Sequence, residues 1–409
     1  MRAYVLVSGA RLAPFGDLVR DLPVGNVPLF ARQRALLERF GLEVVEVDAL
    51  DAIPSDAPAL VTRDDVYFTR RVLKSFLARW RARPTDVVRL ALPTASTFVE
   101  RYATLQALDV DGPHTLYPLW GLAPGAGPVG ARLAAAAPLP VVYAERRVEV
   151  PVPPHITGRD RWTHPITSSV CLPIRHWVHL LQANLLSIQV EWLDTIITRP
   201  WVGMGILLKS LLRRGGLAAR IGGAANLIGR GVSIHPSAIV EGSILGDGVR
   251  IGPQALVRGA VIGAGAVLEQ RVDVSYAVLG PRCFVSKHSL VWATVALEEA
   301  ELCMKGMQMC LVGRGAALTA RATPLDVTPG RRLRVRDGDA IREIDLDVLG
   351  ACFGHRCFVG ADVFTGPGRE VPNGVRIVPD PSRVLARVPD VLEPDALYAV
   401  RDGTLVRVG

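Results

Sequence analysis

The chain has 409 residues, of which 49% are hydrophobic and 21% charged, with 39 glycines and 30 prolines. This composition excludes an intrinsically disordered protein and a single small module, and it predicts two or three turn-rich domains. The formal net charge of +8 is spread along the sequence. Such a charge is typical of a solvated basic surface and favours, more weakly, anionic small molecules or a membrane surface. It is too diffuse to indicate binding to nucleic acid.

The six cysteines form no Cys-x-x-Cys pair and have no zinc-ligand spacing. We therefore expect no disulfide framework and no zinc site, and a cytoplasmic location. The first sixteen residues, MRAYVLVSGARLAPFG, lack the apolar core and cleavage site of a signal peptide. Because no uninterrupted apolar run reaches about 18 residues, we expect no membrane-spanning helix.

The N-terminal part alternates apolar runs with helical patterns. We predict strands at 3–8, 43–48 and 87–92, and helices at 27–41 and 70–83. Strands that alternate with helices are typical of a parallel α/β sheet. We assign residues 1–155 to such an α/β domain.

Four motifs follow one another along the first half of the chain. They are SGARL after the first strand, LPVGNVPLF from Leu22, DDVYF from Asp64 and EWLDT from Glu191. In this order they resemble the motifs of sugar-1-phosphate nucleotidyltransferases. The resemblance implies a nucleotide-binding set of Ser8, Gly9, Arg11 and Asn26. It also implies that Asp65 and Asp194 hold Mg²⁺ during attack by a sugar phosphate.

The same motifs depart from the family at the positions that carry charge. The Gly-rich loop is shorter, a Pro-Lys pair is absent, and Val27 and Val150 stand where the family has lysines. An aliphatic side chain cannot stabilise the charge that develops on a phosphate. The N-terminal domain is therefore predicted to be degenerate. The local alternatives stay open: SGAR as a strand-to-helix turn, Asp65 as a helix N-cap and Asp194 as a surface residue of a long helix.

Residues 156–222 read as a helical connector. Trp177, Leu180 and Leu181 share a helical face, Pro200 interrupts the run, and GILLKSLLRR ends in basic residues. This pattern favours packing between domains or subunits, with a peripheral membrane contact as the alternative. Histidines 164, 176 and 179 have no carboxylate at ligand spacing, so we expect polar residues at a packed junction.

From Ile228 the sequence repeats every seventeen residues. Three columns of aliphatic residues result: Ile228, Leu245, Ile262 and Leu279; Ile234, Ile251, Leu268 and Val285; Val240, Val257, Val274 and Val291. Within each coil the spacing is six, six and five. An α-helix cannot keep one face through steps of six, whereas a three-sided coil of short strands points each of these side chains inward. The repeat predicts a parallel β-helix over residues 223–380.

After Val291 the repeat loses its regular spacing, which indicates altered coils. Residues 324–347 are predicted to be an insertion that contains a β-hairpin around Asp337 and Gly338. The hexapeptide spacing returns at Phe353, Val359, Thr365, Val371 and Ile377. Residues 381–409 are predicted to form a C-terminal cap over the last coil.

The repeat resembles the left-handed hexapeptide-repeat β-helices of acyltransferases and sugar-nucleotide enzymes. The resemblance implies a left-handed coil, a homotrimer, a histidine general base and an acyl-coenzyme A or acyl-carrier donor. His288, between Lys287 and Ser289, is the first candidate base and His355 the second, while His235 is less attractive. The alternative for each is a surface or inter-coil histidine.

Taken together, the sequence predicts a degenerate nucleotidyltransferase-like domain joined to a left-handed parallel β-helix. As an enzyme it would transfer a nucleotidyl or acyl group to a sugar-type substrate in envelope polysaccharide or lipid metabolism. The alternative is a non-catalytic trimeric scaffold, or a nucleotide-sugar-binding protein with an inactive nucleotidyltransferase domain.

Overall fold

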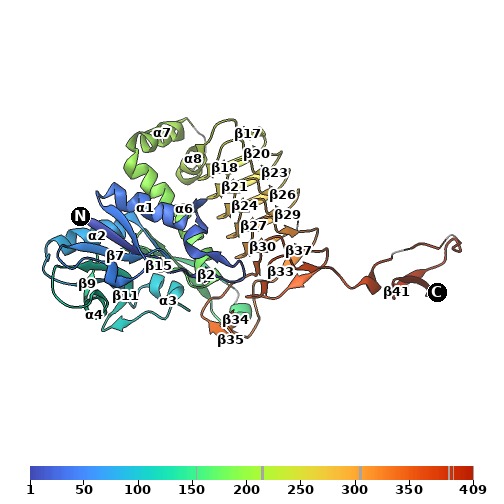
Figure 1. Ribbon diagram of the computed structural model, residues 1–409. Helices are drawn as coiled ribbons and strands as arrows, with labels where there is room; N and C mark the ends of the chain where they lie inside the picture. The colour runs from blue at the N-terminus through green and yellow to red at the C-terminus, as the bar shows by residue number, and fades with distance from the viewer. Residues whose placement is uncertain (153, 213–215, 304–305, 386, 390, 409) are drawn as a thin grey trace.

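The computed structural model describes residues 1–409 except 153, 213–215, 304–305, 386, 390 and 409. An N-terminal α/β domain lies beside a stack of short parallel strands, and the long helix α6 (Trp177–Thr198) lies between them (Figure 1). This arrangement agrees with the predicted architecture of an α/β domain followed by a parallel β-helix.

The N-terminal sheet is mixed. Its strand order is β12-β9-β11-β7-β1-β6, with β10 added to β11. The bounds are β1 (Arg2–Leu6), β6 (Glu43–Val47), β7 (Ala59–Arg63), β9 (Val88–Pro93), β10 (Val110–Asp111), β11 (His114–Leu122) and β12 (Ala137–Pro140). The predicted strands at 3–8, 43–48 and 87–92 are confirmed as β1, β6 and β9.

One strand overturns the prediction of an all-parallel sheet. β1 is parallel to β6 and β7, and β12 is parallel to β9, but β11 is antiparallel to both β7 and β9. A parallel crossover needs a connection of a dozen or more residues, usually a long helix. The helix after β9 is α3 (Thr97–Tyr102), with only six residues, and His114 pairs directly with Pro93. The chain therefore turns back beside the end of β9.

Helices cover both faces of the sheet. α1 (Leu29–Arg39) and α2 (Arg70–Arg81) confirm the two predicted helices with shorter bounds. In α2, Val72, Phe76 and Trp80 repeat at steps of four and are buried in the main core. On the opposite face, α4 (Val129–Ala134) packs into a smaller core around Tyr4 and Val61.

The remaining N-terminal elements are short. They are β2 (Arg11–Leu12), β3 (Asp17–Leu18), η1 (Val19–Asp21), β4 (Pro23–Val24), β5 (Val27–Pro28), η2 (Leu50–Ala52), β8 (Val66–Phe68), β13 (Glu145–Pro151), α5 (Pro154–Thr157), β14 (Arg161–Thr167) and β15 (Cys171–Pro173). β13 pairs with β14, and β15 pairs with β8 beside the start of α6.

The connector consists of three helices: α6, α7 (Pro200–Leu211) and α8 (Leu217–Ala224). The first part of α6, through Val190, is largely buried, whereas Leu193, Ile196 and Ile197 near its end are exposed. Pro200 ends the run of α6 and begins α7. Among the described residues, no helix is both long enough and apolar enough to cross a bilayer.

Three parallel sheets form the β-helix. The first contains β16 (Leu227–Ile228), β19 (Ile244–Leu245), β22 (Val261–Ile262), β25 (Val278–Leu279), β28 (Val295–Ala296), β31 (Leu311–Val312), β36 (Cys352–Phe353) and β39 (Glu370–Val371). The second contains β17 (Ser233–Ile234), β20 (Arg250–Ile251), β23 (Val267–Leu268), β26 (Phe284–Val285), β29 (Glu301–Leu302), β32 (Ala317–Leu318), β37 (Phe358–Val359) and β40 (Arg376–Ile377). The third contains β18 (Ile239–Glu241), β21 (Leu256–Arg258), β24 (Asp273–Ser275), β27 (Leu290–Trp292) and β30 (Met307–Gln308).

The predicted columns are confirmed by the strand register. Ile228 pairs with Leu245, Ile234 with Ile251 and Val240 with Val257, and each later coil repeats these pairings. A separate hydrophobic core containing Leu268, Val274 and Leu279 fills the interior. Gly246 shows why the corners need glycine, because a Cβ there would lie 2.6 Å from the backbone nitrogen of Ala264.

The loss of spacing after Val291 has a local cause. The coils continue, but Val291 pairs with Met307 and Val295 with Leu311, a step of sixteen residues. β33 (Thr323–Pro324) is followed by the predicted insertion, whose hairpin is β34 (Leu333–Asp337) with β35 (Ala340–Ile344). The hexapeptide positions from Phe353 to Ile377 then return in β36 to β40, with β38 at Phe364–Thr365.

The N-terminal domain and α6 pack on the outer face of the first sheet. The outward residues of that sheet are aliphatic in coil after coil and belong to the main core: Val261, Val278, Val295 and Leu311. Trp192 of α6 also donates its Nε1–H to the Gly242 carbonyl oxygen at 2.9 Å. The outer face of the first sheet therefore belongs to the main core of the N-terminal domain, while the interior of the coil has its own.

The C-terminal segment predicted to cap the last coil contains η3 (Pro381–Arg383) and a hairpin of β41 (Tyr398–Arg401) and β42 (Thr404–Arg407). The Gly403 amide donates to the Ser382 carbonyl oxygen at 2.9 Å. The hairpin therefore folds back on η3, and Figure 1 shows it extended beyond the β-helix rather than laid across it.

Candidate functional site

The carboxyl ends of β1 and β7 meet at one edge of the sheet, beside the predicted nucleotide loop. The Ser8 amide donates to Asp64 Oδ1 at 2.9 Å, and Gly9 has a φ of +61°. Arg20 lies with Nη1 3.4 Å from Asp64 Oδ2 and Nη2 2.7 Å from Glu46. The carboxylate that faces the loop is therefore Asp64, which is 1% exposed, and its charge is already met within the protein.

The predicted magnesium ligands have separate surroundings. Asp65 is buried and accepts hydrogen bonds from Arg63 Nε and Nη2 at 3.0 and 2.7 Å. Asp194 lies near the end of α6, where burial raises the pKa of its carboxyl against the opposing effect of Arg70. Among the described residues no group of three or more His, Cys, Asp or Glu side chains could hold a metal ion. Each predicted ligand already has a cationic neighbour, so the residues present do not offer two free carboxylates to Mg²⁺.

The other predicted nucleotide-binding residues make structural contacts. Arg11, in the β2–β3 hairpin, donates from Nη1 to the Gly16 carbonyl oxygen at 2.6 Å. Asn26 has a φ of 64° and donates from Nδ2 to the Leu279 carbonyl oxygen of the β-helix at 2.9 Å. The Gly25 amide donates to Asn184 Oδ1 on α6. The LPVGN segment is thus a junction between the two halves and not an open loop.

His355 joins the same two halves. Its Nδ1 accepts from the Arg314 amide at 2.8 Å, so the neutral ring carries its proton on Nε2, which lies 2.9 Å from Asp17 Oδ2. The ring packs 4.8 Å from that of Phe15, and burial lowers the pKa of His355 against the opposing effect of Asp17. Because both nitrogens are engaged, neither is free to take a substrate proton. The geometry assigns His355 to the domain junction instead of the predicted general base.

His288 has the opposite surroundings. It is exposed at a coil corner with a φ of 65°, and its side chain has no hydrogen-bond partner in the described part of the chain. The adjacent Ser286 hydroxyl and Lys287 amide both donate to Glu269 Oε2, at 3.1 and 3.0 Å. The corner itself is therefore fixed while the imidazole stays open to solvent.

The histidines at the start of α6 are packed polar residues, as their spacing predicted. His179 Nδ1 accepts from the amides of Arg175 and His176, both at 3.1 Å, and its Nε2 lies 2.7 Å from the Thr104 carbonyl oxygen. Burial lowers the pKa of His179 to about 3. The neutral ring ties the beginning of α6 to the N-terminal domain.

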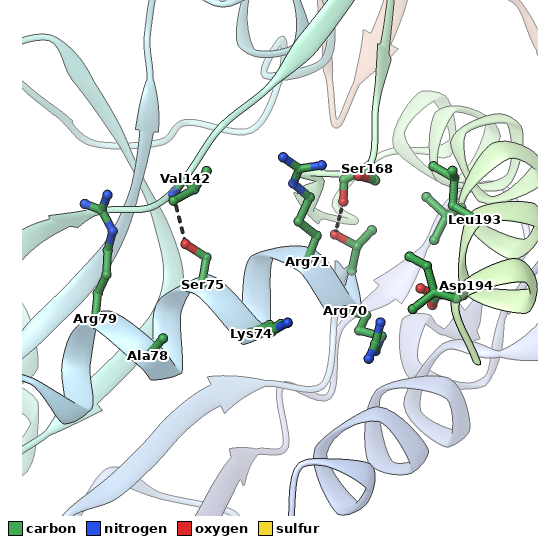
Figure 2. A pocket seen from close by; sticks show the side chains of 13 residues that line it. Arg70, Arg71, Lys74, Ser75, Ala78, Arg79, Val142, Ser168, Leu193 and Asp194 are labelled. Atoms are coloured by element: carbon green, nitrogen blue, oxygen red, sulfur yellow. Dashed lines mark hydrogen bonds between the residues drawn. The ribbon is translucent and has the colours of Figure 1, made fainter. Parts of the chain in front are cut away.

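A cavity of about 580 Å³ lies between α2 and the end of α6 (Figure 2). This volume is in the range of small-molecule sites. One wall carries the cations of α2, and the other is formed by Val190, Leu193 and Ile197 of α6. Figure 2 shows Arg71 and Arg79 pointing to one side of α2, and Arg70 and Lys74 to another.

The charge of this cavity is strongly one-sided. Arg71 and Lys74 are exposed and form no hydrogen bond or ion pair with any described residue, while Arg79 donates to the Pro140 carbonyl oxygen at 2.8 Å. Asp194 is the acidic residue of the lining, and it interacts with Arg70. Two cations therefore remain uncompensated beside an apolar wall.

A second cavity, of about 340 Å³, adjoins the first and shares Thr69, Arg70 and Asp194 with it. Tyr67 belongs to its lining and has a buried hydroxyl that meets no hydrogen-bond partner among the described residues. Burial raises the pKa of this hydroxyl, which keeps it a neutral donor. An unpaired buried hydroxyl costs free energy unless a ligand or water meets it.

Comparison with known proteins gives no family. No family model matches the chain, and no curated protein matches it. The resemblance to nucleotidyltransferases and hexapeptide-repeat proteins therefore rests on the motifs and on the fold described above.

The sequence reasoning missed the basic side of α2. Arg70, Arg71 and Lys74 are visible in the motif RRVLK, and a helix places residues one turn apart on the same side. What the sequence did not reveal is that α6, more than a hundred residues later, supplies the facing wall.

Proposed function

We propose that this protein is a non-catalytic binding protein, in which a parallel β-helix supports an N-terminal domain that holds a sugar phosphate or nucleotide sugar. The ligand lies in the cavity between α2 and α6. The observation that carries the proposal is the pair of uncompensated cations, Arg71 and Lys74, at the wall of this cavity.

The lining matches the chemistry of such ligands. An arginine guanidinium binds phosphate oxygens through two parallel N–H donors, and a lysine ammonium adds a mobile point charge. Arg70 and Arg79 extend the cationic wall on either side. The apolar residues Val190, Leu193 and Ile197 offer a surface for a base or the less polar face of a sugar.

The proposal of a non-catalytic role comes from the carboxylates and the lysine that nucleotidyl transfer would require. Asp64 is engaged by Ser8 and Arg20, Asp65 by Arg63, and Val27 stands where the related enzymes have a lysine. A metal-dependent transfer to phosphate needs free carboxylates and nearby cations at that edge of the sheet.

Acyl transfer is the second candidate function, and His288 is the observation that favours it. Its imidazole is exposed and forms no hydrogen bond with any described residue, so it is open to a substrate proton. The homotrimer, the left-handed coil and an acyl-coenzyme A donor are expectations from the resemblance. Calorimetric heat with acetyl-coenzyme A that disappears in His288→Ala would favour this candidate.

The binding proposal is tested by isothermal titration calorimetry of the full chain with UDP-glucose, glucose 1-phosphate and inorganic pyrophosphate. We expect at least one of these probes to bind, and Arg71→Gln/Lys74→Gln to weaken its binding about tenfold or more, because each lost charge removes a phosphate contact.

The matched control is Arg81→Gln, which removes an exposed cation from the same helix outside the cavity. It should leave the dissociation constant unchanged. The proposal fails if none of the three probes binds, or if the double variant and the control bind as tightly as the wild type.

A further inference from the structure

A second surface is formed by α7, which begins directly after Arg199 of the second cavity. Its exposed residues are large and apolar: Trp201, Met204, Leu207, Leu208, Leu211 and the adjoining Leu212. Trp201 is 67% exposed and Leu212 is 88% exposed. We call these six residues the α7 surface. None of them lines either of the two cavities described above.

α7 departs from the usual amphipathic arrangement of a surface helix. A surface helix normally buries its apolar side and exposes its polar side. In α7 the buried residue is Ser210, 3% exposed, and Arg220 of α8 donates from Nε to its carbonyl oxygen at 2.8 Å. Val202 and Ile206 are half-buried on the same side as Ser210, so α7 carries apolar residues all round and its leucines face out. Contiguous exposed apolar residues of this kind mark an interaction surface.

The sequence around α7 carries charge of one sign. Between Asp194 and Glu241 the sequence contains no aspartate or glutamate, but it has six basic residues: Arg199, Lys209, Arg213, Arg214, Arg220 and Arg230. Arg199 and Lys209, which begin and follow the apolar turns of α7, are both exposed. The complementary partner must therefore be apolar in its interior and anionic at its rim.

We propose that the α7 surface docks on a bilayer that contains anionic lipids. A helix of twelve residues is about 18 Å long, too short to span a hydrocarbon core of about 30 Å. It fits instead in the plane of the membrane, with its leucines in the acyl boundary and its cations among the headgroups. Trp201 has the amphipathic ring that favours the interface.

A second copy of this chain is a poorer partner for the same surface. In a two-fold contact each α7 would meet the other, and Arg199 and Lys209 would face their own counterparts. Like charges brought together cost free energy, and the acid-free stretch offers no carboxylate to offset them. An anionic headgroup layer supplies the missing charge.

Vesicle co-sedimentation of the full chain tests this inference. We expect binding to phosphatidylcholine vesicles that contain phosphatidylglycerol, and weaker binding to pure phosphatidylcholine or at high salt. Trp201→Ser/Leu208→Gln should lower the partition coefficient about tenfold or more, because it removes two apolar side chains that would insert into the membrane. Arg199→Gln/Lys209→Gln should weaken binding to the anionic vesicles alone.

The matched control is Phe364→Ser/Ile341→Gln. Phe364 is as exposed as Trp201, at 67%, and Ile341 is similar to Leu208, at 59% and 57%. The control should bind vesicles as the wild type does.

Equal partitioning of the Trp201/Leu208 variant and wild type would overturn the inference. A change of oligomeric state in that variant, measured by light scattering without vesicles, would assign the surface to a second copy and overturn it as well. Neither outcome depends on ligand binding at the α2–α6 cavity.

Discussion

Exposed side chains have different surroundings in the β-helix and on helices α2 and α7. In the β-helix, charged residues find partners one coil away: Arg230 with Asp247, Arg258 with Glu241 and Arg282 with Glu299, each seventeen residues apart. On α2, by contrast, Arg71 and Lys74 have no such partner among the described residues. On α7 the leucines face outward.

The difference teaches where to look for function in this chain. A repeated coil places each surface residue beside the residue at the same position of the next coil. Opposite charges at these positions can therefore pair within the fold. The helices α2 and α7 have no such equivalent beside them, so the cations of α2 and the leucines of α7 stay available. The two proposals above, ligand binding at α2 and membrane docking at α7, both concern groups that the fold leaves unmatched.

The largest expected effect separates a buried leucine from an exposed one. Leu268 is buried in the β-helix core, so Leu268→Ala should lower the free energy of unfolding by about 2–5 kcal/mol. Leu208 is exposed on α7, and Leu208→Ala should change it by less than about 0.5 kcal/mol. Urea unfolding followed by circular dichroism measures both. Similar losses in the two variants would mean that α7 is covered in solution.

At the start of α6, as in the β-helix, the polar groups already have partners within the protein. The pH dependence of the free energy of unfolding tests this for His179. Burial lowers the pKa of His179 to about 3 from its usual value of 6.5, so the unfolded chain takes up a proton that the folded chain refuses. Its contribution to stability is therefore full above about pH 6.5. It is lost at about 1.4 kcal/mol per pH unit as the pH falls further.

Urea midpoints between about pH 7 and pH 5 measure this slope. His179→Gln should show a shallower decline than the wild type, because the substituted residue does not titrate. The remaining decline reports the other buried histidines, 164, 176 and 355, whose pKa values burial also lowers. An identical slope in variant and wild type would contradict the assignment of His179 as a neutral buried ring.

The smallest expected effect concerns the charge ladder of the β-helix. Glu241 and Arg258 lie 3.0 Å apart on the surface, and Glu241→Gln should cost less than about 1 kcal/mol of unfolding free energy. It should also leave calorimetric binding of UDP-glucose unchanged. A strong effect of Glu241→Gln on binding would remove the contrast between paired and unpaired charges.

The sequence predicted the β-helix well because its physical signal is local. Side chains at Ile234, Ile251 and Leu268 must be aliphatic wherever the coil turns inward, so the spacing reports the structure directly. The step from Val291 to Met307 was harder to recognise, since one residue fewer shifts every later position. The outward column Val261, Val278 and Val295 was a further signal, and it marks the face on which the N-terminal domain packs.

The candidate site was much harder to predict because its parts are distant in sequence. Asp64 and Asp65 are adjacent, and only the structure shows that Asp64 faces the loop at Ser8 while Asp65 pairs with Arg63. His355 finds Asp17 across 338 positions of the chain. Such long-range contacts decide which nitrogen or carboxylate is already hydrogen-bonded. A short sequence motif does not show them.

The central claim is that a phosphate-bearing ligand binds between α2 and α6 and not at the loop of Ser8 and Gly9. The most direct measurement is a crystal structure of the full chain grown with UDP-glucose. The account predicts density for the diphosphate beside Arg71 and Lys74. Density for it beside Ser8 and Gly9, with the Arg20 side chain displaced from Asp64, would contradict the account.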